Sequence, residues 1–208
     1  MKKIMMMALA LLMAGSAVAQ DVQLPAPQKN VPMSLMDALQ LRTSVRQYSD
    51  KALDDATLSQ VLWAACGINR PDTKKITAPS AINAQDILVY VVRQDGAWLF
   101  LPLTNSLRRV STKDLRKEVA GFQEFAAKAP VSLVLVSDKA KFGNRNRGAD
   151  QLGAMDAGYV SENIYLVCTA LGLGTVARAT MDHEALRREL GLSDEQVPLL
   201  NHPVGWLQ

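Results

Sequence analysis

Histidine and cysteine, which supply many catalytic bases, nucleophiles and metal ligands, are scarce in this sequence. Only two of each occur among the 208 residues. His183 and His202 have no second ligand nearby in the sequence, and we expect them at the surface or at a helix cap. Cys66 and Cys168 lie far apart in apolar stretches, which favours buried free thiols over a disulfide or a metal site. A hydrolase or a zinc enzyme is therefore poorly supported.

The standard nucleotide-binding and hydrolase motifs are missing as well. The sequence contains no G-x-G-x-x-G, G-x-x-x-x-G-K-[ST], G-x-S-x-G or H-E-x-x-H. It has no long basic block, and its formal net charge is only +3, which argues against an extended nucleic-acid or membrane footprint. The basic residues of 139–148 are expected to form a solvated loop.

No apolar run is long enough to span a bilayer, which needs roughly 20 residues, but the N-terminus carries a shorter one. Lys2 and Lys3 precede the apolar residues 4–14, and Ala17 and Ala19 form an A-x-A site. This order is typical of a signal peptide. We expect cleavage after residue 19, which leaves 21 basic and 20 acidic residues, and a periplasmic or secreted mature protein.

The apolar periodicity predicts an α+β domain without regular βαβ units. Residues 20–33, with three prolines, should form an extended lead-in to one domain over residues 34–208. We expect helices over residues 35–41, 54–67, 112–129 with a break near Gly121, 155–173 and 181–190. Strands are expected over residues 86–92 and 97–103 as a hairpin, and over 131–137, 175–180 and 197–208.

Two of these elements are apolar on more than one face. The strand at 131–137 is apolar on both faces, so it should be covered on both sides. The second half of the helix at 155–173 is apolar all round, which places it in a core or at a large interface.

Anion-binding and amide groups occur in three segments, "RTSVRQY" (42–48), "PSAINAQ" (79–85) and "ALGLGTV" (170–176). None of the three supplies an obvious acid, base or nucleophile. Such a set suits a bound flavin, because the cofactor then carries the chemistry while the protein positions it.

Each segment offers groups that a flavin needs. Arg42 and Ser44 can donate hydrogen bonds to a phosphate, and Arg46 can stabilise negative charge on the reduced ring. The amide of Asn83 can both donate to and accept from the pyrimidine edge, and Gly172 and Gly174 let backbone N–H groups come close. Taken singly, the first arginine also fits a surface charge, the asparagine a turn residue, and the first glycine a helix cap.

In this order the motifs resemble those of the nitroreductase-like FMN-dependent oxidoreductases, particularly the small members related to the dehydrogenases that oxidise thiazolines and oxazolines. "RTSVRQY" is similar to R-[RT]-S-x-R-x-[FY], and "PSAINAQ" to P-S-x-x-N-x-Q. "DAGYVSENIYLVCTALGLGTV" resembles the central helix of the family and its glycine-containing turn, and "HPVGWLQ" the closing H-P-V-G-Y-P strand. The resemblance covers nearly all of the mature chain.

The resemblance implies an α+β fold with a central, mainly antiparallel sheet flanked by helices, in an intertwined homodimer with one FMN at each end of the interface. It also implies ping-pong hydride transfer through flavin N5 to nitroaromatic, quinone or similar acceptors, with no obligatory protein acid or base. By the same resemblance, Arg42 and Ser44 bind the phosphate, and Arg46 and Asn83 bind the pyrimidine. The backbone at Gly174 and Thr175 lies near N5. Ser80 and Gln85 lie near the ring or the ribityl chain.

One departure from the family pattern concerns the phosphate. Many members carry Lys or Arg residues after the closing strand, whereas no basic residue follows Arg188 here. Either the phosphate site is weaker, or another basic residue substitutes, such as Arg178 or one of the partner subunit.

Other functions stay open at this stage. The protein could be a flavin carrier without turnover, or an interaction protein that keeps the fold without the cofactor. The leader also implies an electron donor outside the cytoplasm, such as a quinol, a thiol system or another flavoprotein, with NAD(P)H serving only as a surrogate in vitro.

Overall fold

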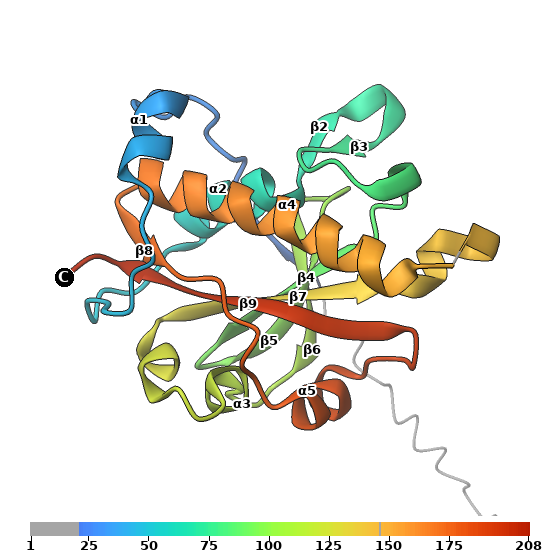
Figure 1. Ribbon diagram of the computed structural model, residues 1–208. Coiled ribbons are helices and arrows are strands. Elements are labelled where there is room, and N and C mark those ends of the chain that lie inside the picture. Colours follow the sequence, from blue (N-terminus) through green and yellow to red (C-terminus); the bar gives the residue numbers. More distant parts are fainter. Residues whose placement is uncertain (1–20, 146) are drawn as a thin grey trace, which may run out of the picture.

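A seven-stranded sheet forms the centre of the molecule (Figure 1). The computed structural model describes residues 21–145 and 147–208, so the expected signal peptide, residues 1–19, lies outside the described residues. The strands of the sheet are β1 (Val22–Gln23), β4 (Ile87–Arg93), β5 (Gly96–Leu101), β6 (Ser106–Ser111), β7 (Val131–Asp138), β8 (Leu173–Thr175) and β9 (Gln196–Trp206). Their order is β1-β6-β5-β4-β7-β9-β8, and each neighbouring pair is antiparallel.

Helices cover both faces of this sheet (Figure 1). One face carries α1 (Leu35–Leu41), α2 (Asp55–Cys66) and α4 (Ala149–Ala170), and the other carries α3 (Arg116–Ala120) and α5 (His183–Leu190). A two-stranded hairpin, β2 (Ile68–Arg70) with β3 (Lys75–Ile76), follows α2. The 3-10 segments are η1 (Pro71–Thr73), η2 (Ala81–Asn83), η3 (Glu124–Lys128) and η4 (Lys139–Arg145).

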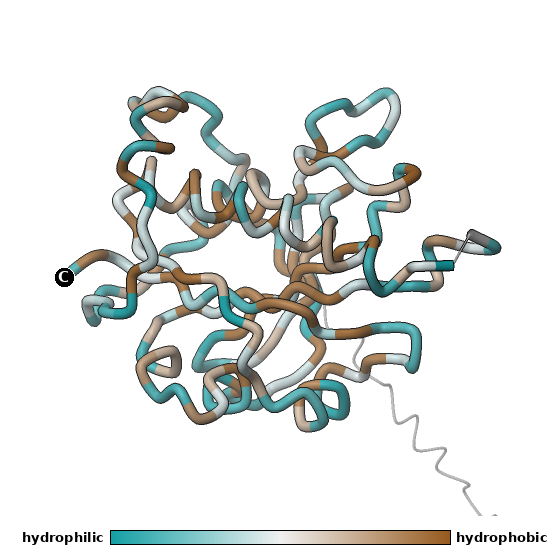
Figure 2. The backbone as a smooth tube through the Cα atoms, in the orientation of Figure 1, coloured by the Kyte–Doolittle hydropathy of each residue, from teal (hydrophilic) through white to brown (hydrophobic). Residues whose placement is uncertain are grey.

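The central strand β7 supplies side chains to two separate cores. Leu133 and Leu135 pack into the core under α2 and α4, whereas Val134 and Val136 pack into the core over α3 and α5. Successive side chains of a strand point to opposite faces, so a strand covered on both sides is mostly apolar along its whole length, as residues 131–137 are apart from the buried Ser132 and Ser137. Figure 2 shows the hydrophobic residues concentrated along the central strands. The prediction for residues 131–137 is confirmed.

Local capping explains why several helix bounds agree with the sequence prediction. The Ser34 hydroxyl accepts the Asp37 backbone N–H at 3.1 Å and starts α1 at the expected residue. Asp54 caps α2 in the same way, and the helix ends before Gly67. Gly121, at φ 58°, separates α3 from η3 where a break was expected. Such side-chain caps contribute roughly 0.5–2 kcal/mol each.

Other elements differ from the prediction. Helix α4 begins at Ala149 instead of residue 155, and Gly172, at φ 71°, follows its end. The strand expected over residues 175–180 lies earlier, as β8 at Leu173–Thr175, and beyond it only a single bridge between Arg178 and Asn201 continues the pairing with β9. Strand β6 and the β2–β3 hairpin were not predicted. The segment expected to be a solvated loop contains Phe142, which is buried.

Both cysteines are free and buried, as expected. Burial raises the pKa of Cys66 to about 12 and raises the pKa of Cys168 as well. Neither thiol is therefore a ready nucleophile. Within the described part of the chain, no helix combines the length and hydrophobicity needed to cross a membrane.

Candidate functional site

The residues expected to bind a flavin fall into two groups that contact α4 at different positions along its length. The first, called the arginine group here, lies at the C-terminal end of the helix and consists of Arg42, Ser44, Arg46, Gly174 and Thr175. The second, called the η2 group, lies near the N-terminal half of the helix and consists of Ser80, Asn83 and Gln85.

Contacts with α4 fix how far apart the two groups are. Ser44 contacts Tyr165, and the η2 segment contacts Asp156 through Ala81. These helix residues are nine positions apart, which corresponds to about 14 Å along the axis. Among the described residues, no hydrogen bond joins the arginine group to the η2 group within one chain.

The arginine group is held to the end of α4 by hydrogen bonds. The Val45 N–H donates to the Thr175 carbonyl at 2.9 Å, which pins the loop after α1 to β8. The Ser44 hydroxyl lies 3.0 Å from the Tyr165 hydroxyl, which also accepts the Ala177 N–H at 2.8 Å. A side chain of the helix thus joins the loop to the segment after β8.

Gly174 allows this close approach. A Cβ at this position would lie 2.6 Å from Cγ1 of Val45 and 3.1 Å from a methyl carbon of Leu207. Any larger residue would push the loop away from β8. The glycine is therefore needed for packing between the loop and the strand, whatever ligand the loop binds.

The guanidinium groups of Arg42 and Arg46 keep their donors available. Within residues 21–145 and 147–208, neither makes a hydrogen bond or an ion pair, although the first stacks 5.1 Å over the Tyr165 ring. By contrast, Arg93 and Arg108 are each paired with a carboxylate. Two uncommitted guanidinium groups beside a serine hydroxyl fit an anion such as a phosphate, because arginine recognises such groups with parallel N–H donors.

Behind the arginine group lies a buried histidine that the sequence interpretation misplaced. His202 was expected at the surface or at a cap, and this is wrong: it is fully buried. Its Nδ1 lies 3.1 Å from the Thr175 hydroxyl and its Nε2 lies 2.8 Å from the Ser161 hydroxyl. Burial lowers the pKa of His202 to about 3, so the imidazole is neutral. The side chain is buried because β9 lies between β7 and β8 instead of at an edge.

The backbone of the η2 group is strained. Ile82, Asn83 and Gln85 have φ values of 49°, 58° and 49°, a region that residues other than glycine seldom occupy. The Ser80 hydroxyl accepts the Gln85 N–H at 2.9 Å and closes the turn. The turn presents the Asn83 side chain to solvent beside Ile82, whose side chain is 53% exposed. Such strain gathers at binding sites, where surrounding contacts maintain it.

A buried pair of carboxyl groups, which the sequence interpretation missed, supports the η2 turn. Both oxygens of Asp156 accept the Ala81 N–H, at 3.0 and 2.9 Å. Asp86 accepts the Ser137 hydroxyl at 2.6 Å through Oδ2, while its buried Oδ1 has no partner among the described residues. Burial and the neighbouring carboxyl of Asp86 raise the pKa of Asp156 to about 6. A proton shared by the two carboxyls would give the orphaned oxygen its partner.

The expectation that Arg178 substitutes for a C-terminal phosphate ligand is wrong. Its guanidinium is buried and committed inside the protein. Nε donates to Gln123 at 2.7 Å, Nη1 to Asn201 at 2.7 Å and Nη2 to the Ala120 carbonyl at 2.6 Å. The side chain ties the end of α3 to β9, so any phosphate must be held by other residues.

Comparisons with known proteins agree with this architecture. The model of the family described as "Nitroreductase family" matches residues 39–206. The chain belongs to the nitroreductase family. A candidate nitroreductase of Methanocaldococcus jannaschii is 31% identical over 198 residues, which cover 89% of this chain and 96% of that protein. The family resemblance noted from the motifs is therefore confirmed, and with it an oxidoreductase family whose members generally use a flavin.

Solved structures show the same fold. A candidate nitroreductase from Ralstonia eutropha has a TM-score of 0.85 and 32% identity, covering 92% of this chain and 91% of that one. A chain of the Escherichia coli microcin synthetase complex McbBCD has a TM-score of 0.70 at 20% identity, covering 99% of this chain and 85% of that one. The second likeness shows the fold alone. The predicted α+β class with a mainly antiparallel sheet is confirmed.

Proposed function

We propose that this nitroreductase-family protein is an exported, FMN-dependent oxidoreductase that works by a ping-pong cycle and reduces nitroaromatic, quinone or similar acceptors. The observation that carries the proposal is the pair of guanidinium groups of Arg42 and Arg46, which belong to the same loop as the Ser44 hydroxyl and make no hydrogen bond or ion pair within residues 21–145 and 147–208. A family whose members generally use a flavin, together with a loop that fits a phosphate, favours FMN over other anions.

The chain would bind and position the cofactor. Arg42 and Ser44 would hold the phosphate, and Arg46 would stabilise negative charge at the pyrimidine end. The backbone at Gly174 and Thr175 would lie beside the ring, held in place by His202 behind it. The flavin supplies hydride transfer at N5, so that no residue of the chain needs to act as acid or base, in keeping with a buried, neutral imidazole.

A homodimer would complete the site. The arginine group and the η2 group of one chain are separated by about 14 Å of α4, so Asn83 would reach the flavin held by Arg46 of a second copy. An isologous pair places each group of one chain against the other group of its partner. Exposed apolar side chains lie on the same side of the molecule, on α1 and α4: Leu35, Met36, Leu39, Met155 and Tyr159. Patches of this kind mark interaction surfaces.

The test is reconstitution with FMN. We expect purified protein to retain or bind FMN with flavin absorbance bands, and bound flavin to be reduced by NADPH or NADH and reoxidised by a quinone. Flavin binding without reduction by any nicotinamide or quinol donor would identify a carrier instead of an enzyme. Failure to bind FMN at micromolar concentration would contradict the proposal and favour a cofactor-free interaction protein.

Export is the second part of the proposal, and it rests on the leader at residues 1–19. Cell fractionation should find the mature protein in the periplasm or the medium, starting near Gln20, and its donor should then be a component outside the cytoplasm. N-terminal sequencing that shows Met1 intact on cytoplasmic protein would contradict export and make NAD(P)H the natural donor.

A further inference from the structure

A cavity lies beneath the β2–β3 hairpin, away from the arginine group. It measures about 350 Å³ and is enclosed by the hairpin, the strands β4 and β5, and the segment η4. Sites for small molecules usually measure about 300–1,000 Å³, so the cavity suits a ligand at the small end of that range. The proposed redox reaction gives it no role.

The floor of the cavity is apolar. Ile76, Ile87, Val89 and Phe100 line it, and each is at most 7% exposed and belongs to the main core. At the rim, Leu103 is 67% exposed. A ligand that fills this space would bury an apolar body against the core, at roughly 25 cal/mol per Å² of apolar surface removed from water.

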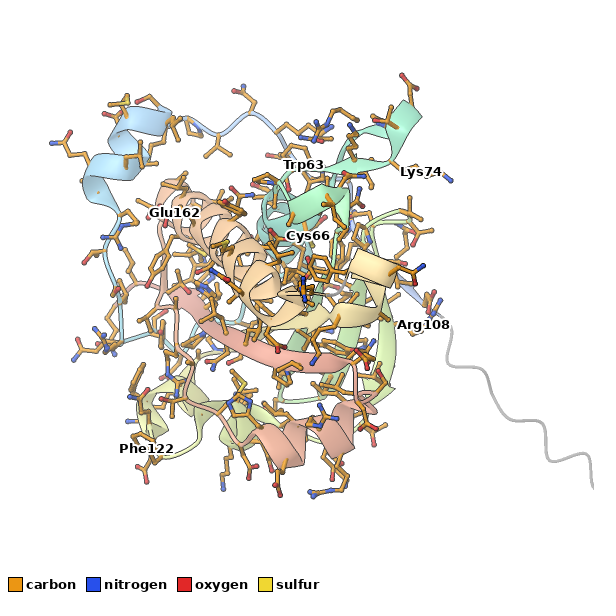
Figure 3. All side chains as sticks on the ribbon, turned by 45° about the vertical axis from the view of Figure 1, so that its right-hand side comes forward. Trp63, Cys66, Lys74, Arg108, Phe122 and Glu162 are labelled. Atoms are coloured by element: carbon orange, nitrogen blue, oxygen red, sulfur yellow. The ribbon has the colours of Figure 1, made fainter. Side chains whose placement is uncertain are left out.

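The charge around the cavity has one sign. Among the described residues that line it, Lys74 and Lys141 are charged and no aspartate or glutamate is present. Lys74 is exposed at the outer end of the hairpin, while Cys66 lies in the interior (Figure 3). Two ammonium groups without a carboxylate leave a site that attracts an anion.

Lys141 is anchored where it can meet a ligand. Its Nζ donates to the Gln85 carbonyl at 2.8 Å, which holds the ammonium against the mouth of the cavity. The same charge acts on the buried thiol of Cys66, where it opposes the burial that raises the pKa of that group to about 12. Lys141 therefore lines the cavity while its side chain is also exposed to solvent.

We propose that this cavity binds a small amphipathic carboxylate, with its apolar body on the core residues and its anionic end between Lys74 and Lys141. The chemistry is that of a medium-chain fatty acid or an aryl-alkyl acid. The two lysines proposed to hold the anion belong to neither the arginine group nor the η2 group, although Gln85 of the η2 group lines the cavity and contacts both of them.

The test compares three probes of equal chain length on the purified protein, below their aggregation concentrations, by isothermal titration calorimetry. Decanoate is the expected ligand, 1-decanol lacks the charge, and decyltrimethylammonium reverses it. We expect decanoate to bind about tenfold more tightly than the alcohol, since a charge-assisted contact contributes roughly 1.5–3 kcal/mol, and the cation to bind most weakly.

Matched variants locate the site. Lys74→Gln with Lys141→Gln should remove the preference for decanoate over decanol and leave the binding of decanol unchanged. Lys51→Gln with Lys113→Gln is the control, because it removes the same charge away from the cavity. Lys51 lies over the Trp206 ring and Lys113 is paired with Glu189. This double variant should keep the preference for decanoate over decanol. Absence of decanoate binding, equal binding of acid and alcohol, or equal losses in the two double variants would each overturn the proposal.

Discussion

The hydroxyl oxygens of Tyr165 and Ser44 lie 3.0 Å apart and join α4 to the loop that carries Arg42 and Arg46. The same tyrosine oxygen accepts the Ala177 N–H. One phenol thus positions two chain segments that meet at the end of the helix. The loop geometry therefore depends on a helix residue that contributes no charge of its own.

Tyr165→Phe should destabilise the protein and weaken FMN binding. The substitution removes the acceptor for a backbone N–H and the partner of Ser44, at a cost of about 1–3 kcal/mol in the free energy of unfolding. Urea denaturation and FMN titration measure the two effects. Asp150→Asn on the same helix is the control, because that carboxylate is exposed and lies outside the exposed apolar surface of α1 and α4. Equal stability and FMN affinity in the two variants would show that the phenol does not position the loop.

Arg42→Ala should weaken FMN binding about 10- to 100-fold, because a charge-assisted hydrogen bond to phosphate contributes roughly 1.5–3 kcal/mol. Fluorescence quenching of free FMN on binding gives the dissociation constant. Arg108→Ala is the control, since that arginine is exposed and paired with Asp21. An unchanged dissociation constant for Arg42→Ala would remove this residue from the phosphate site.

Local sequence signals predicted much of the fold. Ser34 and Gly121 act on their immediate neighbours, so a cap and a helix break could be read from the sequence. The order of the strands in the sheet is a tertiary property that no local signal contains. For this reason the sequence did not predict that His202 is buried. It also did not predict that the buried guanidinium of Arg178 donates a hydrogen bond to the Ala120 carbonyl.

The candidate site was predictable only in part. Motif similarity proposed Ser44 and Asn83 as ligands, but it carried no information on the distance between them. Asp86 and Asp156 were missed because each carboxylate is isolated in the sequence, before a strand and within a helix, and only folding brings them together. Asp156 is the one acidic residue within the small and apolar stretch 152–160, and that isolation is the signal that would have identified it.

The exposed apolar side chains of α1 and α4 should form the dimer interface. Leu39→Glu with Met155→Glu places charges at two half-exposed positions of that surface, and we expect sedimentation velocity to show monomers in place of dimers at micromolar concentration. Loss of the second copy should also reduce FMN binding. The interface should exceed the standard buried area of roughly 1,600 Å².

The control for this pair is Phe122→Glu. Phe122 is 84% exposed and lies on the opposite side of the sheet, near α3 (Figure 3), so its variant should remain dimeric. Wild-type protein that sediments as a folded monomer with FMN bound would contradict the proposed assembly.

Asp156→Asn should change how stability depends on pH. In the folded protein the pKa of Asp156 is raised from 3.8 to about 6, by burial and by the Asp86 carboxyl. The folded state therefore binds a proton that the unfolded state releases between these pH values. The stability from this group is complete below pH 3.8 and is lost as the pH rises through about 6.

His202 has the opposite dependence, so the wild-type profile alone does not isolate Asp156. Its pKa is lowered by burial from 6.5 to about 3, and its contribution to stability is complete above pH 6.5 and is lost as the pH falls toward 3. Both proteins in the comparison keep this histidine. Its contribution therefore cancels when the free energy of unfolding of Asp156→Asn is subtracted from that of the wild type at each pH.

The difference in the free energy of unfolding, wild type minus Asp156→Asn, should fall by on the order of 1–3 kcal/mol as the pH rises from about 4 to 7. The amide introduced by the substitution would not titrate. Its NH₂ group can donate to the Asp86 carboxyl while its oxygen accepts the Ala81 N–H, as a protonated Asp156 would. Urea denaturation at a series of pH values measures the difference.

The control for this comparison is Asp150→Asn in the first turn of the same helix, where the carboxylate is exposed. Its profile should run parallel to that of the wild type, because an exposed carboxylate has nearly the same surroundings in the folded and unfolded chains. A parallel profile for Asp156→Asn as well would mean that the two buried carboxyls share no proton, and that the η2 turn is held by the Ala81 contact alone.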